Sequence, residues 1–280
     1  MTEEKHFLIG DVSRICNISR KALRYYDEIN LIPSLRDHDN NYRYYTEEAL
    51  LAVPVIKYYK TMGFTLEEMK EFIEGENANI FKSLQASFLA KSKELKQQQQ
   101  EIRRKHICVK EWYDLITEAE TVISNDIREV SIKFVESSDL LFMDQDFDGN
   151  QKAALINIDF TKHIEKLENS IAGPVIINFS SRQDRMIRKE QRVKIMQKSV
   201  MPCPEEYSYQ FGGSLMASCY HIGRHDDIGE TYLKIAQWAK VNGYILDNQS
   251  FERYVTDYWT TNNISKFVTE IMIKVTRPNH

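Results

Sequence analysis

Residues 7–45 read FLIGDVSRICNISRKALRYYDEINLIPSLRDHDNNYRYY, and this stretch decides the fold of the N-terminal part of the chain. Its first half predicts two short helices, separated by a tight turn at Asn17 and Ile18, with Ser19 as N-cap of the second. The inner face of that second helix is predicted to carry Ala22, Leu23, Tyr26 and Ile29. The outer face then carries Lys21, Arg24, Tyr25 and Glu28. A basic and aromatic face suits a DNA groove, although an ordinary solvated helix face has the same composition.

The second half of this stretch has the pattern of a hairpin wing. Pro33 ends the helix, and residues 37–41 supply turn residues between two short extended segments. Alternation along the second segment puts Arg43 on one face and its tyrosine neighbours on the other. Arg43 can therefore reach a phosphate while at least one tyrosine packs inward. The whole stretch predicts a winged helix-turn-helix.

Two further helices are predicted after the wing. Thr46 caps the first, which Gly63 ends, and residues 65–68 (TLEE) form a capping box for the second, which Gly75 can close. Pro54 lies too far inside the first of these helices to occupy its first turn. It therefore predicts a kink in that helix or its division into two.

A long helix is predicted over residues 76–118, which contain neither Pro nor Gly and are rich in Lys, Glu and Gln. Positions spaced alternately by three and four residues are mostly apolar: Phe81, Leu84, Phe88, Leu95, Ile102, Val109, Trp112 and Ile116. The remaining positions of the stripe, Lys91, Gln98 and Lys105, fall on one heptad position. This pattern favours a dimeric coiled coil over intramolecular packing, because a lone long helix has few other ways to bury such a stripe.

From about residue 127 the sequence becomes rich in β-type segments. They are REVSIKFVE, DLLFMDQDF, GPVIINFS, EEYSYQFGG, SLMASCYHIG, QSFERYVTDYW and SKFVTEIMIKV, with amphipathic helices near 152–171 and 226–242. The order strand, strand, helix, strand, strand occurs twice, which predicts one α+β domain with an internal pseudo-repeat. A cleft between its halves would be a usual place for a small ligand. The predicted domains are 1–75, 76–120 and 121–280.

Composition limits the classes of function. A net charge of −4 gives no support to nucleic-acid binding, so only the placement of Lys and Arg can. The four cysteines form no CxxC pair, which argues against a zinc site, a redox dithiol or a disulfide framework. We expect no metal and no cofactor. No apolar run is long enough to span a membrane and the first residues do not resemble a signal peptide, so we expect a cytoplasmic protein.

The run LRYYDEINLIP, the YRYY wing and the GFTLEEM helix resemble the N-terminal domain of the MerR family of activators, over about residues 7–75. The resemblance implies a dimer joined by an antiparallel coiled coil on a pseudo-palindromic promoter, which distorts the spacer DNA so that RNA polymerase holoenzyme can engage it. With the outer helix face and wing, it gives these candidate DNA-binding residues: Arg14, Ser19, Arg20, Lys21, Arg24, Tyr25, Arg36, Tyr42, Arg43, Tyr44, Lys57 and Lys60. Pro54 departs from the family pattern.

The segment FGGSLMASCYHIGRHDDIGETYLKIAQWAKVNGYI, followed by SFERY, resembles the GyrI-like effector domain of multidrug-responsive members of the BmrR type. The resemblance implies that Glu252 meets a lipophilic cation in an aromatic pocket. Strand alternation puts Tyr254 and Tyr258 on the face of Glu252, and a carboxylate between two tyrosines favours a cation. Phe267, Tyr220 and His221 are further candidates, although only one of the last two can point inward. Alternatively, Glu252 is a surface carboxylate paired with Arg253 or a lysine.

Three functions compete at this point. The first is a ligand-responsive transcription activator without enzyme activity. The second is a hydrolase activity of the GyrI-like domain, since some isolated proteins of that type are hydrolases, although no catalytic motif demands one. The third is a ligand-independent repressor with a vestigial pocket.

Overall fold

The computed structural model describes residues 5–36, 42–74 and 80–277. The chain divides into two compact units, Met1–Gln100 and Glu101–His280, and each is described here by itself. Within the described residues, no helix combines the length and the apolar character that a membrane crossing requires.

The N-terminal unit contains the predicted helix-turn-helix and wing. Helix α1 (Ile9–Ile15) is followed by α2 (Arg20–Glu28), and the Ser19 hydroxyl accepts a hydrogen bond from the backbone N–H of Ala22 at 3.1 Å. Strands β1 (Phe7–Leu8), β2 (Leu35–Arg36) and β3 (Arg43–Tyr45) form a three-stranded antiparallel sheet in the order β1-β3-β2. The predicted wing turn at 37–41 lies outside the described residues. Helices α3 (Glu47–Thr61) and α4 (Leu66–Glu74) complete the unit.

The core of this unit contains residues of the predicted inner face of α2. Leu23 and Tyr26 of α2 are buried together with Val12, Tyr45 and Ile56 from the neighbouring elements. Lys21, Arg24, Tyr25 and Glu28 are exposed, as predicted from their helical spacing.

Pro54 does not divide α3, which runs unbroken from Glu47 to Thr61, so the prediction of a split helix is wrong. A proline has no N–H to donate to the carbonyl four residues earlier, here that of Leu50. The Cys16 thiol supplies a replacement donor, with its Sγ 3.7 Å from the Leu50 carbonyl oxygen. Pro54 itself is exposed, so its ring displaces no core side chain.

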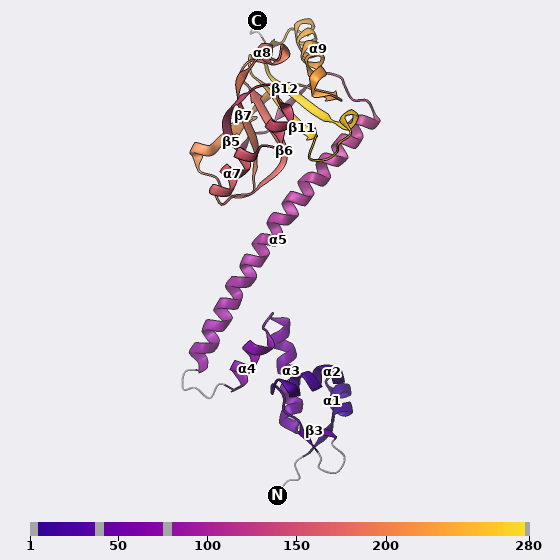
Figure 1. The fold of residues 1–280 in the computed structure, drawn as a ribbon, viewed down its shortest axis with the longest axis vertical. Coiled ribbons are helices and arrows are strands. Elements are labelled where there is room, and N and C mark those ends of the chain that lie inside the picture. Colours follow the sequence, from indigo (N-terminus) through magenta and orange to yellow (C-terminus); the bar gives the residue numbers. More distant parts are fainter. Residues whose placement is uncertain (1–4, 37–41, 75–79, 278–280) are drawn as a thin grey trace. The chain divides into compact units, whose positions relative to one another are not determined.

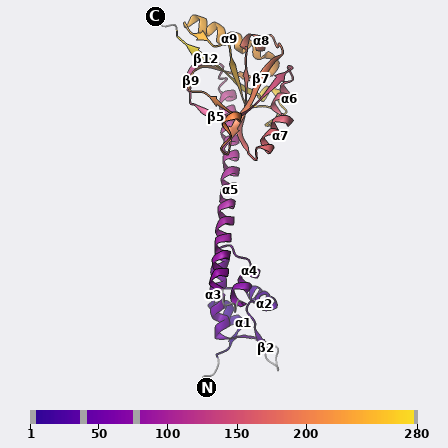
Figure 2. The same ribbon diagram turned by 90° about the vertical axis from the view of Figure 1, so that its left-hand side faces the viewer.

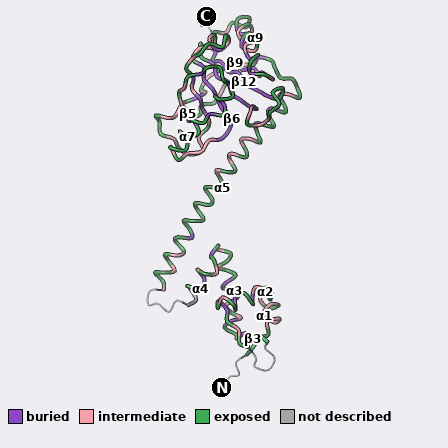
Figure 3. Tube along the Cα trace, in the orientation of Figure 1, coloured by how far each residue is buried: buried purple, intermediate pink, exposed green. Residues whose placement is uncertain are grey.

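Helix α5 (Ile80–Ser124) is a single helix of 45 residues (Figure 1). It extends further at its C-terminal end than the predicted residue 118. Much of α5 is coloured as exposed in Figure 3. Several apolar residues of the predicted stripe are exposed, among them Leu95 and Ile116. Ile102 is 67% exposed and Val109 is 68% exposed, which is unusual for side chains that favour burial.

The C-terminal unit is built on one nine-stranded sheet with the order β4-β9-β12-β11-β6-β7-β5-β8, in which β10 also pairs with β12. Figure 2 labels four of these strands, β5, β7, β9 and β12. The strands of its first half are β4 (Ser131–Val135), β5 (Ser138–Phe147), β6 (Ile171–Phe179) and β7 (Gln191–Ser199). Those of the second half are β8 (Ser208–Phe211), β9 (Ser214–Ile222), β10 (Ile245–Leu246), β11 (Ser250–Thr256) and β12 (Val268–Thr276). The two halves pair at the centre of the sheet through β11 and β6, and again toward its two edges through β4 with β9 and through β5 with β8. This symmetric arrangement fits the predicted internal pseudo-repeat.

The helices of this unit are α6 (Gln151–Leu155), α7 (Ile158–Lys166), α8 (Arg182–Met186) and α9 (Ile228–Val241). The single helix predicted over 152–171 is two helices, because Asn157 caps α7 by accepting the Phe160 N–H at 2.8 Å. Strand β7 and helix α8 are absent from the predicted segments. Their sequence, SRQDRMIRKEQRVKIMQKS, is largely polar and resembles a loop.

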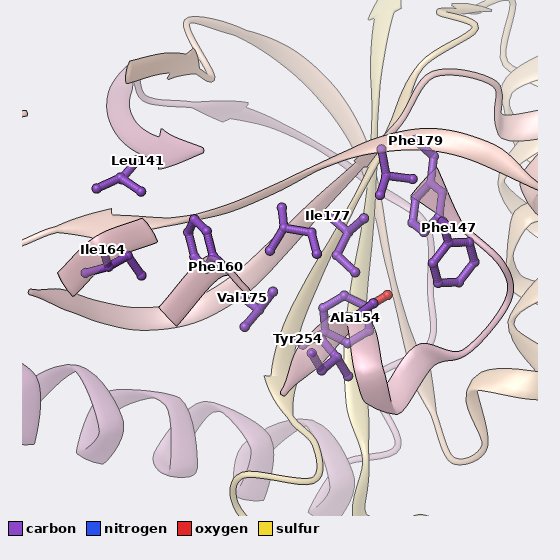
Figure 4. Close-up of a cluster of buried hydrophobic side chains, with 12 residues drawn as sticks. Leu141, Phe147, Ala154, Phe160, Ile164, Val175, Ile177, Phe179 and Tyr254 are labelled. Atoms are coloured by element: carbon purple, nitrogen blue, oxygen red, sulfur yellow. The ribbon is translucent and has the colours of Figure 1, made fainter. Parts of the chain in front are cut away.

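The two faces of this sheet bury different layers. Figure 4 shows one core, in which Ala154 and Phe160 from the helices meet Ile177, Phe179 and Tyr254 from the strands. On the opposite face, the C-terminal part of α5 packs on Val255 and Val268 through apolar residues that include Leu115 and Ala119. Successive residues of β11 therefore face different layers.

Candidate functional site

The exposed face of α2 gathers part of the predicted DNA-binding set. Arg20, Lys21, Arg24 and Tyr25 are all exposed, and Ser19 is engaged as the N-cap of the helix. The Tyr25 side chain is 46% exposed, which places an aromatic ring on a basic surface. Such a surface can contact both phosphates and base edges.

The wing is tied to α2 by Arg43. Its Nε lies 2.8 Å from Oδ2 of Asp27, whose other oxygen accepts the backbone N–H of Ser34 at 2.8 Å. The structure thus gives Arg43 a role in holding the wing against α2. Burial would raise the pKa of Asp27, but these hydrogen bonds and the Arg43 charge lower it below its ordinary value. Tyr45 is fully buried, so it is the tyrosine that packs inward.

The remaining predicted DNA-binding residues differ in their exposure and in their contacts within the unit. Arg14 forms an ion pair with Asp11, and the Lys57 ammonium donates to the Cys16 carbonyl at 3.2 Å, at the end of α1. Arg36, Tyr42 and Lys60 are exposed, and Tyr44 is half-buried. Arg14 and Lys57 are therefore engaged within the unit, while the outer face of α2 offers the most accessible basic groups.

In the C-terminal unit, Glu252 is fully buried and its carboxylate is completely surrounded by donors. Arg185 of α8 donates from Nε to Oε1 at 2.7 Å and from its terminal nitrogen to Oε2 at 3.1 Å. The hydroxyls of Tyr232 and Tyr254 donate to the same two oxygens, the former at 2.9 Å. Glu252 is thus neither a surface carboxylate nor paired with Arg253. The cation that meets it in this structure is the protein's own guanidinium.

Further groups contact the Arg185 side of this ion pair. The guanidinium of Arg185 also donates to the Gln151 side chain at 3.1 Å and lies 4.6 Å from the centre of the Phe179 ring. Burial would raise the pKa of Glu252, but the Arg185 charge and the hydrogen bonds from Arg185, Tyr254 and Tyr232 lower it. The pair therefore stays ionised inside the fold.

Three of the predicted ligand residues come together beside this pair. Tyr254, Tyr258 and Phe267 surround the buried ring of His225, whose centre lies 5.3, 6.0 and 5.1 Å from theirs. Within the part of the chain that the structure describes, neither ring nitrogen of His225 has a hydrogen-bond partner. Because burial disfavours its charged form, the pKa of His225 falls to about 4. The rings therefore form an aromatic cluster around a neutral imidazole, and the Lys152 ammonium lies over one of them, 5.3 Å from the centre of the Tyr258 ring.

Tyr220 and His221 separate, as their neighbouring positions on one strand require. His221 lies on the face of Tyr254 and contacts Thr231 of α9 at 2.9 Å. Tyr220 lies on the other face, where its hydroxyl donates to Glu118 of α5 at 2.8 Å. Arg253 joins the same carboxylate and also donates to Glu270 at 2.8 Å. Tyr220 is thus part of the contact between α5 and the sheet.

Sequence reasoning missed Arg185, Tyr232, Gln151 and His225. Arg185 lies in a polar stretch that looks like a surface loop, and nothing in its spacing marks it as buried. Tyr232 could have been found, because helical spacing places it on the apolar face of α9 with Ile228 and Ile235. Within the described residues, no cluster of His, Cys, Asp and Glu has the arrangement of a metal site.

Two family models match this chain, one in each of its two units. The GyrI-like small molecule binding domain matches residues 128–276, and the MerR family regulatory protein model matches residues 8–45. The multidrug-efflux transporter 1 regulator of Bacillus subtilis (strain 168) is 45% identical over 80 residues, which are 28% of this chain and 29% of that protein. The multidrug-efflux transporter 2 regulator of the same strain is 22% identical over 277 residues, 97% of each chain.

Among solved structures, the EcmrR–DNA complex in EcmrR-RPo is similar over 97% of this chain and all of that chain. The sequences are 19% identical and the TM-score is 0.47.

Proposed function

Because the chain belongs to the family of the GyrI-like small molecule binding domain and carries a MerR family regulatory domain ahead of it, we propose that it is a ligand-responsive transcription regulator. The observation that carries this proposal is the exposed Lys21, Arg24 and Tyr25 face of α2 beside a wing that Arg43 fixes to it. Two relatives named as regulators of multidrug-efflux transporters support it.

The proposed mechanism requires a dimer. Two chains pair through the exposed apolar stripe of α5 in an antiparallel coiled coil, which gives two α2 helices for the two halves of a pseudo-palindromic promoter. When a small lipophilic molecule occupies the C-terminal unit, the dimer distorts the spacer DNA so that RNA polymerase holoenzyme can engage both promoter elements. The protein acts in the cytoplasm as an activator.

We propose that the effector binds near the aromatic cluster of Tyr254, Tyr258 and Phe267, with His221 and Glu252 on the same face. Hydrolysis of the effector is the alternative function of such a domain. A mass measurement of the effector after long incubation separates the two, because a sensor leaves it unchanged.

Transcription in vitro from the DNA upstream of the protein's own gene tests the proposal as a whole. We expect a panel of lipophilic cations, including tetraphenylphosphonium, to contain at least one compound that raises transcript yield with the protein present. Unchanged yield with every compound, together with normal DNA binding, would favour a ligand-independent repressor.

Replacement of Arg24 by Ala is expected to weaken promoter binding at least tenfold, because a basic contact to DNA contributes about 1–3 kcal/mol and the dimer loses it twice. Fluorescence anisotropy with labelled promoter DNA at several salt concentrations measures this change. Lys96→Ala, which removes an exposed charge from α5, is the matched control and should bind normally. Equal weakening by both substitutions would mean that α2 has no special role.

A further inference from the structure

The carboxylate predicted to receive a cation is already occupied. Arg185 is 4% exposed and holds both oxygens of Glu252, and two tyrosine hydroxyls take further positions around them. An incoming cation would have to expel a buried guanidinium from its partner, which leaves that charge unpaired at a cost of several kcal/mol. A free carboxylate for a cationic ligand must therefore be sought elsewhere in the unit.

Asp257, directly after β11, is such a carboxylate. The residue is 3% exposed, and its side chain accepts one hydrogen bond, from the backbone N–H of Trp259 to Oδ1 at 2.8 Å. Among the described residues, no basic group forms an ion pair with it. Burial accordingly raises the pKa of Asp257 to about 6. A buried carboxylate with so few partners is costly unless something else satisfies it.

Asp257 also lines a cavity with aromatic walls. The cavity has a volume of about 210 Å³, and its other lining side chains include Trp112 of α5, Pro174, Gln197, Tyr254 and Trp259. No basic residue is found among the described residues that line it. The nearby Glu111 carboxylate, which approaches Gly173, is already paired with Lys198 at 2.5 Å. Asp257 is therefore the carboxylate left to meet a ligand there.

The size and lining indicate the class of ligand. Pockets for drug-sized molecules usually have volumes of roughly 300–1,000 Å³, so this cavity suits a smaller molecule. Indole and phenol rings around one carboxylate favour a quaternary or protonated amine, because the ring faces and the charge both attract it. A neutral molecule of the same shape would leave the buried carboxylate unsatisfied.

We propose that the Asp257 cavity is a binding site for a compact organic cation of the alkylammonium class, held by the Asp257 carboxylate between the rings of Trp112 and Trp259. This inference rests on the proposed function, in which the C-terminal unit senses a small molecule. It moves the charge recognition from Glu252 to Asp257. It also brings the ligand into contact with α5, because Trp112 belongs to that helix.

Calorimetric titration of the full-length chain tests the site with two probes of the same shape. Choline carries a quaternary ammonium, and 3,3-dimethylbutan-1-ol has a neutral carbon in its place. We expect choline to bind at pH 7.5 at least tenfold more tightly than the neutral alcohol. Asp257→Asn should lower choline affinity at least tenfold, whereas Asp159→Asn, at an exposed carboxylate of α7, should leave it unchanged.

Further variants keep the test decisive if Asp257→Asn does not fold. Trp112→Leu should also weaken choline binding, and it replaces Asp257→Asn if circular dichroism shows that the latter does not fold. Loss of choline binding in Glu252→Gln but not in Asp257→Asn would overturn the proposal, as would equal affinity for the two probes. Promoter binding, measured without choline, separates this outcome from failure of the proposed function. Normal DNA binding without choline binding refutes the Asp257 site alone.

Discussion

Substitution of Met for Arg185 should lower the free energy of unfolding of the C-terminal unit by about 3–5 kcal/mol, the range for removing one partner of a buried ion pair. Met fills a similar volume but leaves Glu252, which is fully buried, without a counter-charge. The hydroxyls of Tyr232 and Tyr254 would still donate to it, but they carry no positive charge. Urea denaturation, followed by circular dichroism, measures the loss.

Two further variants test the cause of this loss. Arg192→Met removes an exposed arginine from β7 and should change stability by less than about 0.5 kcal/mol. The double substitution Arg185→Met with Glu252→Gln should recover part of the stability, because no buried charge then remains unpaired. If Arg185→Met costs no more than Arg192→Met, the ion pair does not stabilise the fold.

Substitution of Asp for Ile102 should convert the proposed dimer into a monomer and weaken promoter binding by about 100-fold or more, because the second DNA contact is then no longer tethered to the first. Ile102 is 67% exposed at the middle of the apolar stripe of α5, so a charge there should not disturb either unit. In a coiled coil, however, that carboxylate would be buried without a partner. Sedimentation equilibrium gives the mass, and anisotropy gives the affinity for DNA.

Gln100→Asp is the matched control for this substitution. Gln100 is exposed and lies two residues before Ile102, on the opposite side of the helix. The control should remain dimeric and bind promoter DNA normally. A dimeric Ile102→Asp protein would mean that the stripe serves another purpose than pairing two chains.

Local patterns predicted the N-terminal unit well because its elements depend on neighbouring residues. The cap at Ser19 and the inner face with Leu23 and Tyr26 follow from spacing alone, and both are present. Pro54 is different, because its effect depends on whether a distant group can satisfy the carbonyl of Leu50. The Cys16 thiol lies far away in the sequence, so no local pattern reports it.

The effector site was predicted less completely, for the same reason. Alternation along β11 correctly puts Glu252 and Tyr254 on one face. The partner of Glu252 comes from α8, a helix in a polar stretch that local patterns assign to a loop. The pairing of buried charges depends on tertiary contacts. The sequence around a single arginine therefore does not show that this arginine is buried and paired. The separation of Tyr220 from His221 was predictable, but which of them faces Glu252 depends on the strand register.

The alternation of charges along β11 also fixes how this strand can be aligned. Glu252 faces Arg185 in one layer, and the next residue, Arg253, faces Glu118 and Glu270 in the other. A slip of one residue would turn each charge toward the opposite layer, where it would meet a group of its own sign. Apolar side chains tolerate approximate neighbours, whereas two buried charges of opposite sign do not. Electrostatic repulsion therefore disfavours an off-by-one pairing of β11, and this helps to fix the register of the central strand.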